Sequence, residues 1–168
     1  MAKKKDYREL LKTPFDTGIR NFAEVAKYFL YYTPSIDSAH SSGPIPDNRA
    51  TELLAEMLDS TGLAGNTRFL KRILQASWKN SELDEYVIDF EKSRMLCDMY
   101  NNENELHALL RHIRNSLAHG YVYVWKKKKG NFIMLVDYDA GKHKPTAKIL
   151  ITSTILEQWK AILENEIV

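Results

Sequence analysis

The sequence holds a single cysteine, Cys97, among its 168 residues. One cysteine excludes an intrachain disulfide and a cysteine-rich zinc cluster, and it is typical of a protein from a reducing compartment. Residues 1–5 are followed by Asp6, Tyr7 and Arg8 and not by an apolar segment, so they do not resemble a secretory signal. No apolar run approaches the roughly 18 residues that a membrane-spanning helix requires. We therefore expect a cytoplasmic protein that does not interact with membranes.

The common motifs for metal and phosphate binding are also missing from the sequence. There is no glycine-rich phosphate loop and no serine-nucleophile motif. His107, His112 and His119 lie in one helical segment, but their spacing places them on different faces of a helix. We therefore expect neither a metal site nor a cofactor.

Acidic residues are absent from the segment 106–130, which contains six basic residues. The preceding segment, 81–105, carries eight acids against two basic residues, while the net charge of the whole chain is +2. A basic segment of this kind is typical of contact with a polyanion such as RNA. Its lysine run, which includes Lys126, Lys127 and Lys128, has a simpler interpretation as the solvated tip of a hairpin.

Hydrophobic periodicity predicts a mostly helical chain with one short region of strands. The length of 168 residues favours a single domain that spans residues 1–168. Apolar residues at helical spacing predict helices over about 13–33, 48–61, 66–78, 81–97, 102–120 and 154–163. β-branched and aromatic residues predict strands over 121–125, 132–138 and 147–152.

These elements predict a mainly α fold, a bundle of five or six helices with a small three-stranded antiparallel β-meander before the last helix. The meander is expected to form an insertion over residues 121–152. Residues 1–13 are expected to form a basic leader, and residues 33–47, rich in proline and serine, a flexible loop.

The helix predicted over 102–120 carries side chains of chemical interest near its carboxyl end. Arg111, Asn115 and His119 project away from the apolar stripe of this helix, and Arg114 lies on the flank of the stripe. Arginine can hold a phosphate by two parallel hydrogen bonds, and histidine exchanges a proton near neutral pH. Together these residue types can break a phosphodiester without a metal.

A purely structural interpretation of the same residues also fits the sequence. Cationic side chains in a last helical turn interact favourably with the helix dipole, and Gly120 is an ordinary C-terminal cap. Asn115 and His119 are four residues apart and share a face, which capping does not require. Arg114 and His119 are five residues apart, so their directions differ by roughly 140° around a regular helix. A two-fold dimer with this helix at its interface would bring two arginines and two histidines into one cleft.

The segment 113–120, Ile-Arg-Asn-Ser-Leu-Ala-His-Gly, closely resembles the R-N-x-x-x-H-G signature of HEPN domains (higher eukaryotes and prokaryotes nucleotide-binding). The resemblance implies a HEPN-like helical bundle that forms homodimers, similar to a bacterial subgroup encoded beside mobile and defence genes. Many HEPN proteins are metal-independent ribonucleases of toxin–antitoxin and phage-defence systems. Carried over to this chain, the resemblance implies that His119 moves protons, Arg114 stabilises negative charge and Asn115 orients His119 or a phosphate oxygen.

The resulting hypothesis is a metal-independent endoribonuclease that cleaves RNA by attack of a ribose 2′-hydroxyl at a composite site in a dimer. Arg111, Lys126, Lys127 and Lys128 are its expected substrate-binding residues. The residues His119-Gly120-Tyr121 also resemble the His-x-Tyr extension of toxins that an antitoxin silences by adenylylating the tyrosine. This resemblance makes Tyr121 a candidate modification site and an antitoxin a candidate partner. Packing of Tyr121 at the start of a strand is the simpler interpretation. The alternative function is a non-catalytic HEPN module for dimerisation or nucleotide binding, in which the arginine and histidine are structural.

Overall fold

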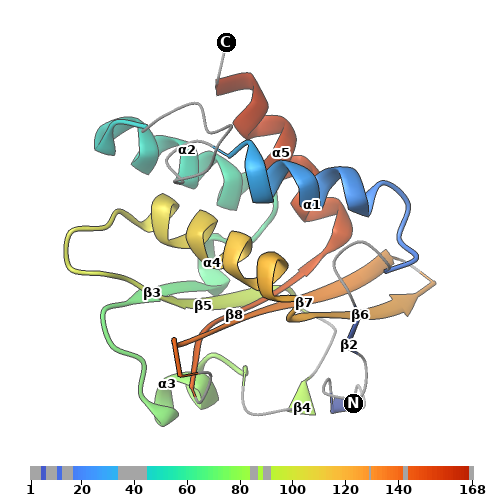
Figure 1. Ribbon diagram of the computed structural model, residues 1–168. Coiled ribbons are helices and arrows are strands. Elements are labelled where there is room, and N and C mark those ends of the chain that lie inside the picture. The colour runs from blue at the N-terminus through green and yellow to red at the C-terminus, as the bar shows by residue number, and fades with distance from the viewer. Residues whose placement is uncertain are drawn as a thin grey trace.

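The computed structural model describes residues 5–6, 11–12, 17–33, 45–83, 87–88, 92–128, 130–141 and 144–166. In this part of the chain a six-stranded sheet is covered on one face by four helices, and a shorter helix lies on the other face (Figure 1). The helices are α1 (Phe22–Tyr31), α2 (Asp47–Ser60), α3 (Gln75–Asn80), α4 (Glu105–His119) and α5 (Ser153–Glu166), with a single 3-10 turn at Ala64–Asn66. None of these helices has the length and apolar composition needed to cross a bilayer.

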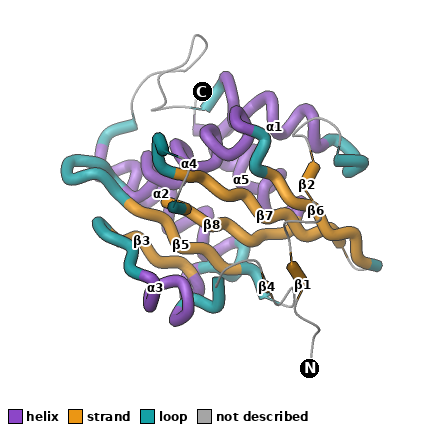
Figure 2. The backbone as a smooth tube through the Cα atoms, turned by 60° about the horizontal axis from the view of Figure 1, so that its bottom comes forward, coloured by secondary structure: helices purple, strands orange, loops and turns teal. Residues whose placement is uncertain are grey.

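The six strands lie side by side in the order β2-β6-β7-β8-β5-β3 (Figure 2). Every neighbouring pair is antiparallel except β3 and β5, which are parallel. The bounds are β2 (Leu11–Lys12), β3 (Thr67–Leu70), β5 (Arg94–Asp98), β6 (Val122–Lys127), β7 (Gly130–Tyr138) and β8 (Pro145–Thr152). A separate two-stranded sheet pairs β1 (Lys5–Asp6) with β4 (Val87–Ile88).

The prediction of a helical bundle with a three-stranded meander is therefore wrong, because the fold is α+β. The three predicted strands do pair in the expected order, as β6, β7 and β8, but they form the middle of a larger sheet and not an insertion. The two helices predicted over 66–78 and 81–97 are replaced by β3, the short α3 and β5. Most of the predicted leader and loop, 1–13 and 33–47, and the predicted start of the first helix at Thr13 lie outside the described residues.

Burial on both faces explains why β5 was predicted as a helix. Met95, Leu96 and Cys97 are each fully buried, although neighbouring side chains of a strand point to opposite faces of the sheet. A strand covered on both sides has no alternation of apolar and polar residues, and its short apolar run matches a buried helix equally well. β5 is covered in this way because α4 packs on one side of the sheet and the α3 region on the other.

Helix α4 lies at the centre of the core, between the sheet and helices α1 and α2. Its apolar stripe, which includes Leu109, Leu110 and Ile113, is fully buried, as the sequence predicts. The side chain of Asn104 caps the helix by accepting a hydrogen bond from the His107 amide at 2.8 Å, so the helix begins later than residue 102, where the sequence predicts its start. At the other end Gly120 adopts a left-handed conformation with φ of 77° and turns the chain into β6.

We predict that the Cys97 thiol does not react in the folded protein. Burial and the neighbouring Asp98 carboxylate raise the pKa of this thiol, so the reactive thiolate is disfavoured and reagents are excluded. Iodoacetamide should alkylate the protein only after denaturant is added, which mass spectrometry detects as one adduct per chain. Rapid alkylation under native conditions would contradict the buried position of β5.

Candidate active site

The carboxyl end of α4 opens into a pocket of about 520 Å³ between the helix and the ends of β5, β7 and β8. Two of the three predicted catalytic residues, Asn115 and His119, line this pocket, whereas Arg114 does not. The other residues that line it are Asp98, Tyr100, Arg111, Tyr121, Tyr138, Ala140, Thr146 and two further aspartates, Asp137 and Asp139.

A row of aromatic rings forms one wall of the pocket and begins at His119. The exposed His119 ring lies 6.5 Å from the ring of Tyr121, which in turn lies 4.8 Å from the ring of Tyr138 at an angle of 64°. Tyr121 directly precedes β6, so it packs at the start of this strand as the simpler interpretation predicts. Both tyrosines are partly buried, and they hold the wall in place beside the helix end.

The ends of β7 and β8 contribute residues from both faces of the sheet to the pocket. Asp137 faces α4, where it meets His112, whereas Tyr138 packs with Met134 and Val136 on the other face, as the alternation of a strand requires. The pocket lies at the ends of these strands, so residues of both faces reach it. The register also shifts here, because Asp137 pairs with Ala147 and Tyr138 with Pro145, which leaves Thr146 as an extra residue in β8. Such an irregularity is frequent beside active sites.

Two of the aspartates that line the pocket hold a buried histidine between them. His112 Nδ1 lies 2.8 Å from Asp137 Oδ2, and His112 Nε2 lies 2.9 Å from Asp98 Oδ1. Asn115 donates from Nδ2 to the same Asp137 oxygen at 3.2 Å. The His112 side chain is fully buried. This cluster, which we call the histidine hub (Asp98, His112 and Asp137), fixes the side chain of Asn115 and joins α4 to β5 and β7.

The hydrogen bonds of the hub favour the charged form of its histidine. Burial opposes the charged form, but the hydrogen bonds with Asp137 and Asp98 outweigh burial and raise the pKa of His112 above its ordinary value. Burial raises the pKa of Asp98 in turn, but the hydrogen bond and charge of His112, together with Arg111, lower it overall. Both ring nitrogens of His112 therefore donate hydrogen bonds to carboxylates.

The two arginines of α4 differ in whether they are paired. Arg111 donates from Nε to Glu103 Oε1 at 2.7 Å, lies 3.4 Å from Asp98 Oδ1 and covers the ring of Tyr100 at 3.9 Å. Arg111, an expected substrate-binding residue, is thus held by the protein itself. In contrast, Arg114 has no acidic partner in the part of the chain that the structure describes, and its buried Nε lacks a hydrogen-bond partner there. An orphaned N–H group of this kind is rare in folded proteins.

The predicted lysine contacts lie far from this pocket. Lys126 and Lys127 end β6, and Lys128 lies in the turn to β7. Tyr121 lies at the opposite end of the same strand, roughly 20 Å away at the usual rise per residue. The terminal nitrogen of Lys126 would lie 2.6 Å from a Cβ atom at Gly18, so this side chain packs on the segment before α1. The structure therefore does not bring these lysines together with His119.

The acidic character of the pocket was missed from the sequence. In the sequence, no acid follows Asn115 and His119 until Asp137. Folding nevertheless brings Asp98, Asp137 and Asp139 next to the helix face that carries these two residues. One feature of the sequence could have indicated it. Asp137 lies near the end of an otherwise apolar predicted strand, and an acid that is buried there needs a hydrogen-bond or charge partner. Despite these acids, no group of three or more side chains suited to a metal ion occurs among the described residues.

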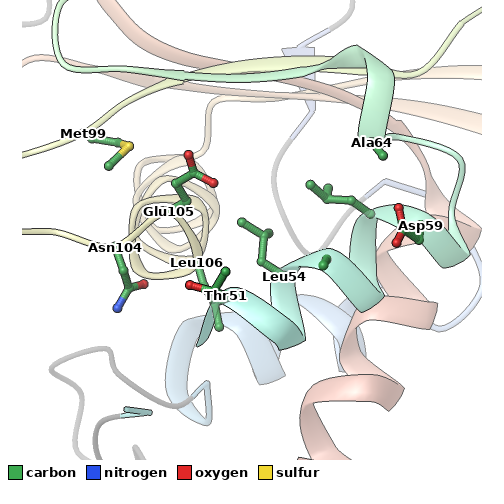
Figure 3. Close-up of a pocket in the computed structure, with 10 residues that line it drawn as sticks. Thr51, Leu54, Asp59, Ala64, Met99, Asn104, Glu105 and Leu106 are labelled. Carbon is green, nitrogen blue, oxygen red and sulfur yellow. The ribbon is translucent and has the colours of Figure 1, made fainter. Parts of the chain in front are cut away.

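A second pocket, of about 550 Å³, lies between α2 and the amino end of α4 (Figure 3). Leu54 and Leu106 form part of its apolar wall, and Asp59 and Glu105 lie at its margins. No histidine, arginine, lysine or tyrosine lines this pocket. Among the described residues it offers carboxylates but no cation for a phosphate and no histidine, so the pocket at His119 is the better candidate for an active site.

A comparison with protein families agrees with the motif on α4. The family model described as HEPN pEK499 p136 matches residues 44–166, which contain α2 to α5 and the whole pocket. The chain belongs to this HEPN family. The match covers the sheet as well as the helices, so strands β3 and β5 to β8 are part of this HEPN domain. Neither the curated proteins nor the solved structures yielded a match.

We predict that His112 makes the stability of this HEPN domain fall at alkaline pH. Because its folded pKa is raised, its contribution is fully present below the ordinary value of 6.5 and is lost as the pH rises through the folded pKa. The lowered pKa of Asp98 acts in the opposite sense, so stability is also lost as the pH falls below 3.8. Urea unfolding of wild type and His112→Gln between about pH 6 and 9 measures the effect, and the variant should be less stable and less dependent on pH.

The matched control is His107→Gln, which changes a partly buried histidine of the same helix outside the pocket. It should keep the pH dependence of the wild type. Complete removal of the ring in His112→Ala leaves buried Asp137 without its cation and Asp98 with Arg111 alone, and should cost about 3–5 kcal/mol. Equal pH profiles for wild type and His112→Gln would show that the hub does not hold a charged histidine.

Proposed function

We propose that this HEPN protein is a metal-independent endoribonuclease of a toxin or phage-defence system, with composite active sites in a homodimer. The observation that carries the proposal is the separation of two residues on α4. His119 opens into the pocket, whereas Arg114 lies on another flank of the helix and has no acidic partner among the described residues. Membership of a HEPN family supports a ribonuclease or nucleotide-related role, and HEPN domains commonly act as dimers and bind RNA.

The available side chains suit attack of a ribose 2′-hydroxyl on the adjacent phosphorus. His119 takes the proton of the 2′-hydroxyl as the new P–O bond forms, and a protonated histidine returns a proton to the departing 5′-oxygen. Arg114 stabilises the negative charge that gathers on the phosphate oxygens. Asn115, fixed by Asp137, orients the phosphate or the His119 ring. General acid–base catalysis contributes roughly 10²–10⁴-fold to such a reaction.

The geometry of a single chain argues for two copies. Arg114 and His119 point in directions that differ by roughly 140° around α4. Of these two residues only His119 reaches the pocket, and Arg111, the one arginine that lines it in the described part of the chain, is paired with Glu103. A two-fold axis beside the end of α4 would place Arg114 of one copy opposite His119 of the other.

The position of His119 in the last turn of α4, where a basic side chain is common, favours a second candidate, a non-catalytic module that binds a nucleotide or serves in dimerisation. On this alternative, His119 is a helix-end cation and Arg114 a half-buried structural residue. The two functions differ in whether RNA is cut.

We predict that the purified protein cleaves RNA in the presence of excess EDTA, because the proposed groups need no metal. The products should end in 2′,3′-cyclic phosphate and 5′-hydroxyl, which mass spectrometry identifies. His119→Ala and Arg114→Ala should each lower the rate at least 100-fold, and Asn115→Ala less, because acid–base and charge-stabilising groups contribute factors of about this size.

Matched controls are His107→Ala on the same helix and Arg72→Ala at an exposed position, and both should cleave at the rate of wild type. Activity that disappears in EDTA and returns with magnesium would sink the mechanism. If the His119 and Arg114 variants melt several degrees lower but retain full activity, these residues are structural.

We predict that two inactive variants restore activity when they share a dimer. Arg114→Ala and His119→Ala are mixed after reversible unfolding, and random pairing makes half of the dimers mixed. Each mixed dimer has one site with both an arginine and a histidine, so about a quarter of the wild-type rate should return. A lower recovery is expected if both sites share one cleft that needs all four side chains.

Each variant unfolded and refolded alone is the control and should remain inactive. Native mass spectrometry of differently tagged chains verifies that mixed dimers are present. No recovery in a mixture that contains them would mean that Arg114 and His119 act within one chain or not at all.

A further inference from the structure

The pocket beside His119 has features that the cleavage step alone does not use. Among the described residues, three carboxylates, those of Asp98, Asp137 and Asp139, line it together with one arginine, Arg111. The cations beside these acids, Arg111 and His112, are already engaged by Glu103, Asp98 and Asp137. A phosphate group inside the pocket would meet carboxylates at short range with no uncommitted cation among these residues, which is unfavourable. The pocket is therefore better suited to a neutral group that donates hydrogen bonds.

Flat aromatic surfaces are the second feature. Tyr121 and Tyr138 form one wall, with ring centroids 4.8 Å apart. Tyr100 lines the pocket as well, carries Arg111 over its ring and is 62% exposed, so much of its surface remains open to a ligand. Stacking on tyrosine is the usual way in which a protein holds an unstacked nucleobase.

The size and position of the pocket agree with a nucleoside. Its volume of about 520 Å³ lies within the range of pockets that enclose small organic ligands. His119 lies at its edge, exposed to solvent. A base inside the pocket would leave its ribose and phosphate at this edge, where a proton acceptor is needed.

The carboxylates also favour particular bases. An ionised carboxylate only accepts hydrogen bonds, and its two oxygens retain acceptor capacity when one donor already binds. Guanine presents two adjacent donors, N1–H and the N2 amine, which match two carboxylate oxygens. Adenine and cytosine present one amine beside an acceptor nitrogen, and uracil presents one N–H between two carbonyls.

We infer that this pocket is a nucleobase subsite that selects bases with hydrogen-bond donors, guanine above all, by tyrosine stacking and by the carboxylates around Asp139. The inference rests on the proposed ribonuclease function, because it places the nucleotide to be cut next to His119. It assigns the sheet residues a role in choosing where RNA is cleaved.

The test is direct binding of nucleotides, measured without cleavage. The 3′-monophosphates of guanosine, adenosine, cytidine and uridine are titrated into the wild-type protein by isothermal calorimetry, with ribose 5-phosphate as a probe that lacks a base. We expect guanosine 3′-monophosphate to bind most tightly, uridine 3′-monophosphate at least about tenfold more weakly, in line with the discrimination of a paired base edge, and ribose 5-phosphate not measurably.

Two variants separate the contributions of stacking and of charge. Tyr100→Leu should weaken binding of all four nucleotides roughly five- to 150-fold, because every base can stack on an aromatic ring. Asp139→Asn should weaken guanosine binding about tenfold and bring it close to that of uridine. The matched controls are Tyr31→Leu, at an exposed tyrosine of α1, and Asp59→Asn, in the other pocket, and both should bind like wild type.

The outcomes distinguish this inference from the proposed function. Selective binding of guanosine 3′-monophosphate without any RNA cleavage would support the subsite and remove the catalytic role. Cleavage of RNA without base-selective binding, or ribose 5-phosphate binding as tightly as the nucleotides, would overturn the subsite and leave the ribonuclease. A further result would also overturn the subsite: spermidine binds more tightly than every nucleotide, and this binding is lost in Asp139→Asn. The pocket would then be a site for organic cations.

Discussion

The charged contact between His112 and two aspartates is the interaction on which the candidate site depends. It joins the middle of α4 to Asp98 at the end of β5 and to Asp137 near the end of β7, so one side chain sets the position of the helix relative to the sheet. Burying His112 and Asp137 is costly unless their charges are paired, and here the two face each other while half-buried Asp98 faces the second ring nitrogen. A helix that could otherwise slide along an apolar surface is thereby held in one register, and Asn115 shares the same aspartate oxygen.

The distribution of the arginines follows from the same cluster. Carboxylates that balance His112 also attract Arg111, which is held by Glu103 and Asp98 and is thereby used for structure. Arg114, three residues on, lies on the flank that faces away from these acids and keeps a buried Nε atom without a partner among the described residues. Two identical residue types on one helix thus differ in role because only one of them meets the acidic end of the sheet. This difference makes Arg114 the better candidate for contact with a phosphate.

The sequence predicted α4, its cap glycine, the three strands that follow and the last helix. Each of these elements has a clear hydrophobic periodicity or a local signal such as a capping residue. It also located Asn115 and His119 on one helix face, as the pocket has them. It could not predict β3 and β5 as strands, since β5 is covered on both faces and lacks alternation. The acids around His119 come from β5, β7 and the turn after β7, and their approach depends on long-range pairing that local patterns do not encode. The lysines lie at the far end of β6, in agreement with their simpler interpretation as the tip of a hairpin.

The sheet changes what the HEPN motif can do. A helix end that carries Asn115 and His119 offers acid–base groups but no enclosed surface for a substrate. Strands β7 and β8 supply that surface at their ends, where Asp137 faces α4, Tyr138 faces the other side of the sheet, and both reach the pocket. Tyr121 packs on the same face as Tyr138, so the two rings meet there. The end of the sheet thus couples the motif on the helix to a pocket whose chemistry belongs to the strands.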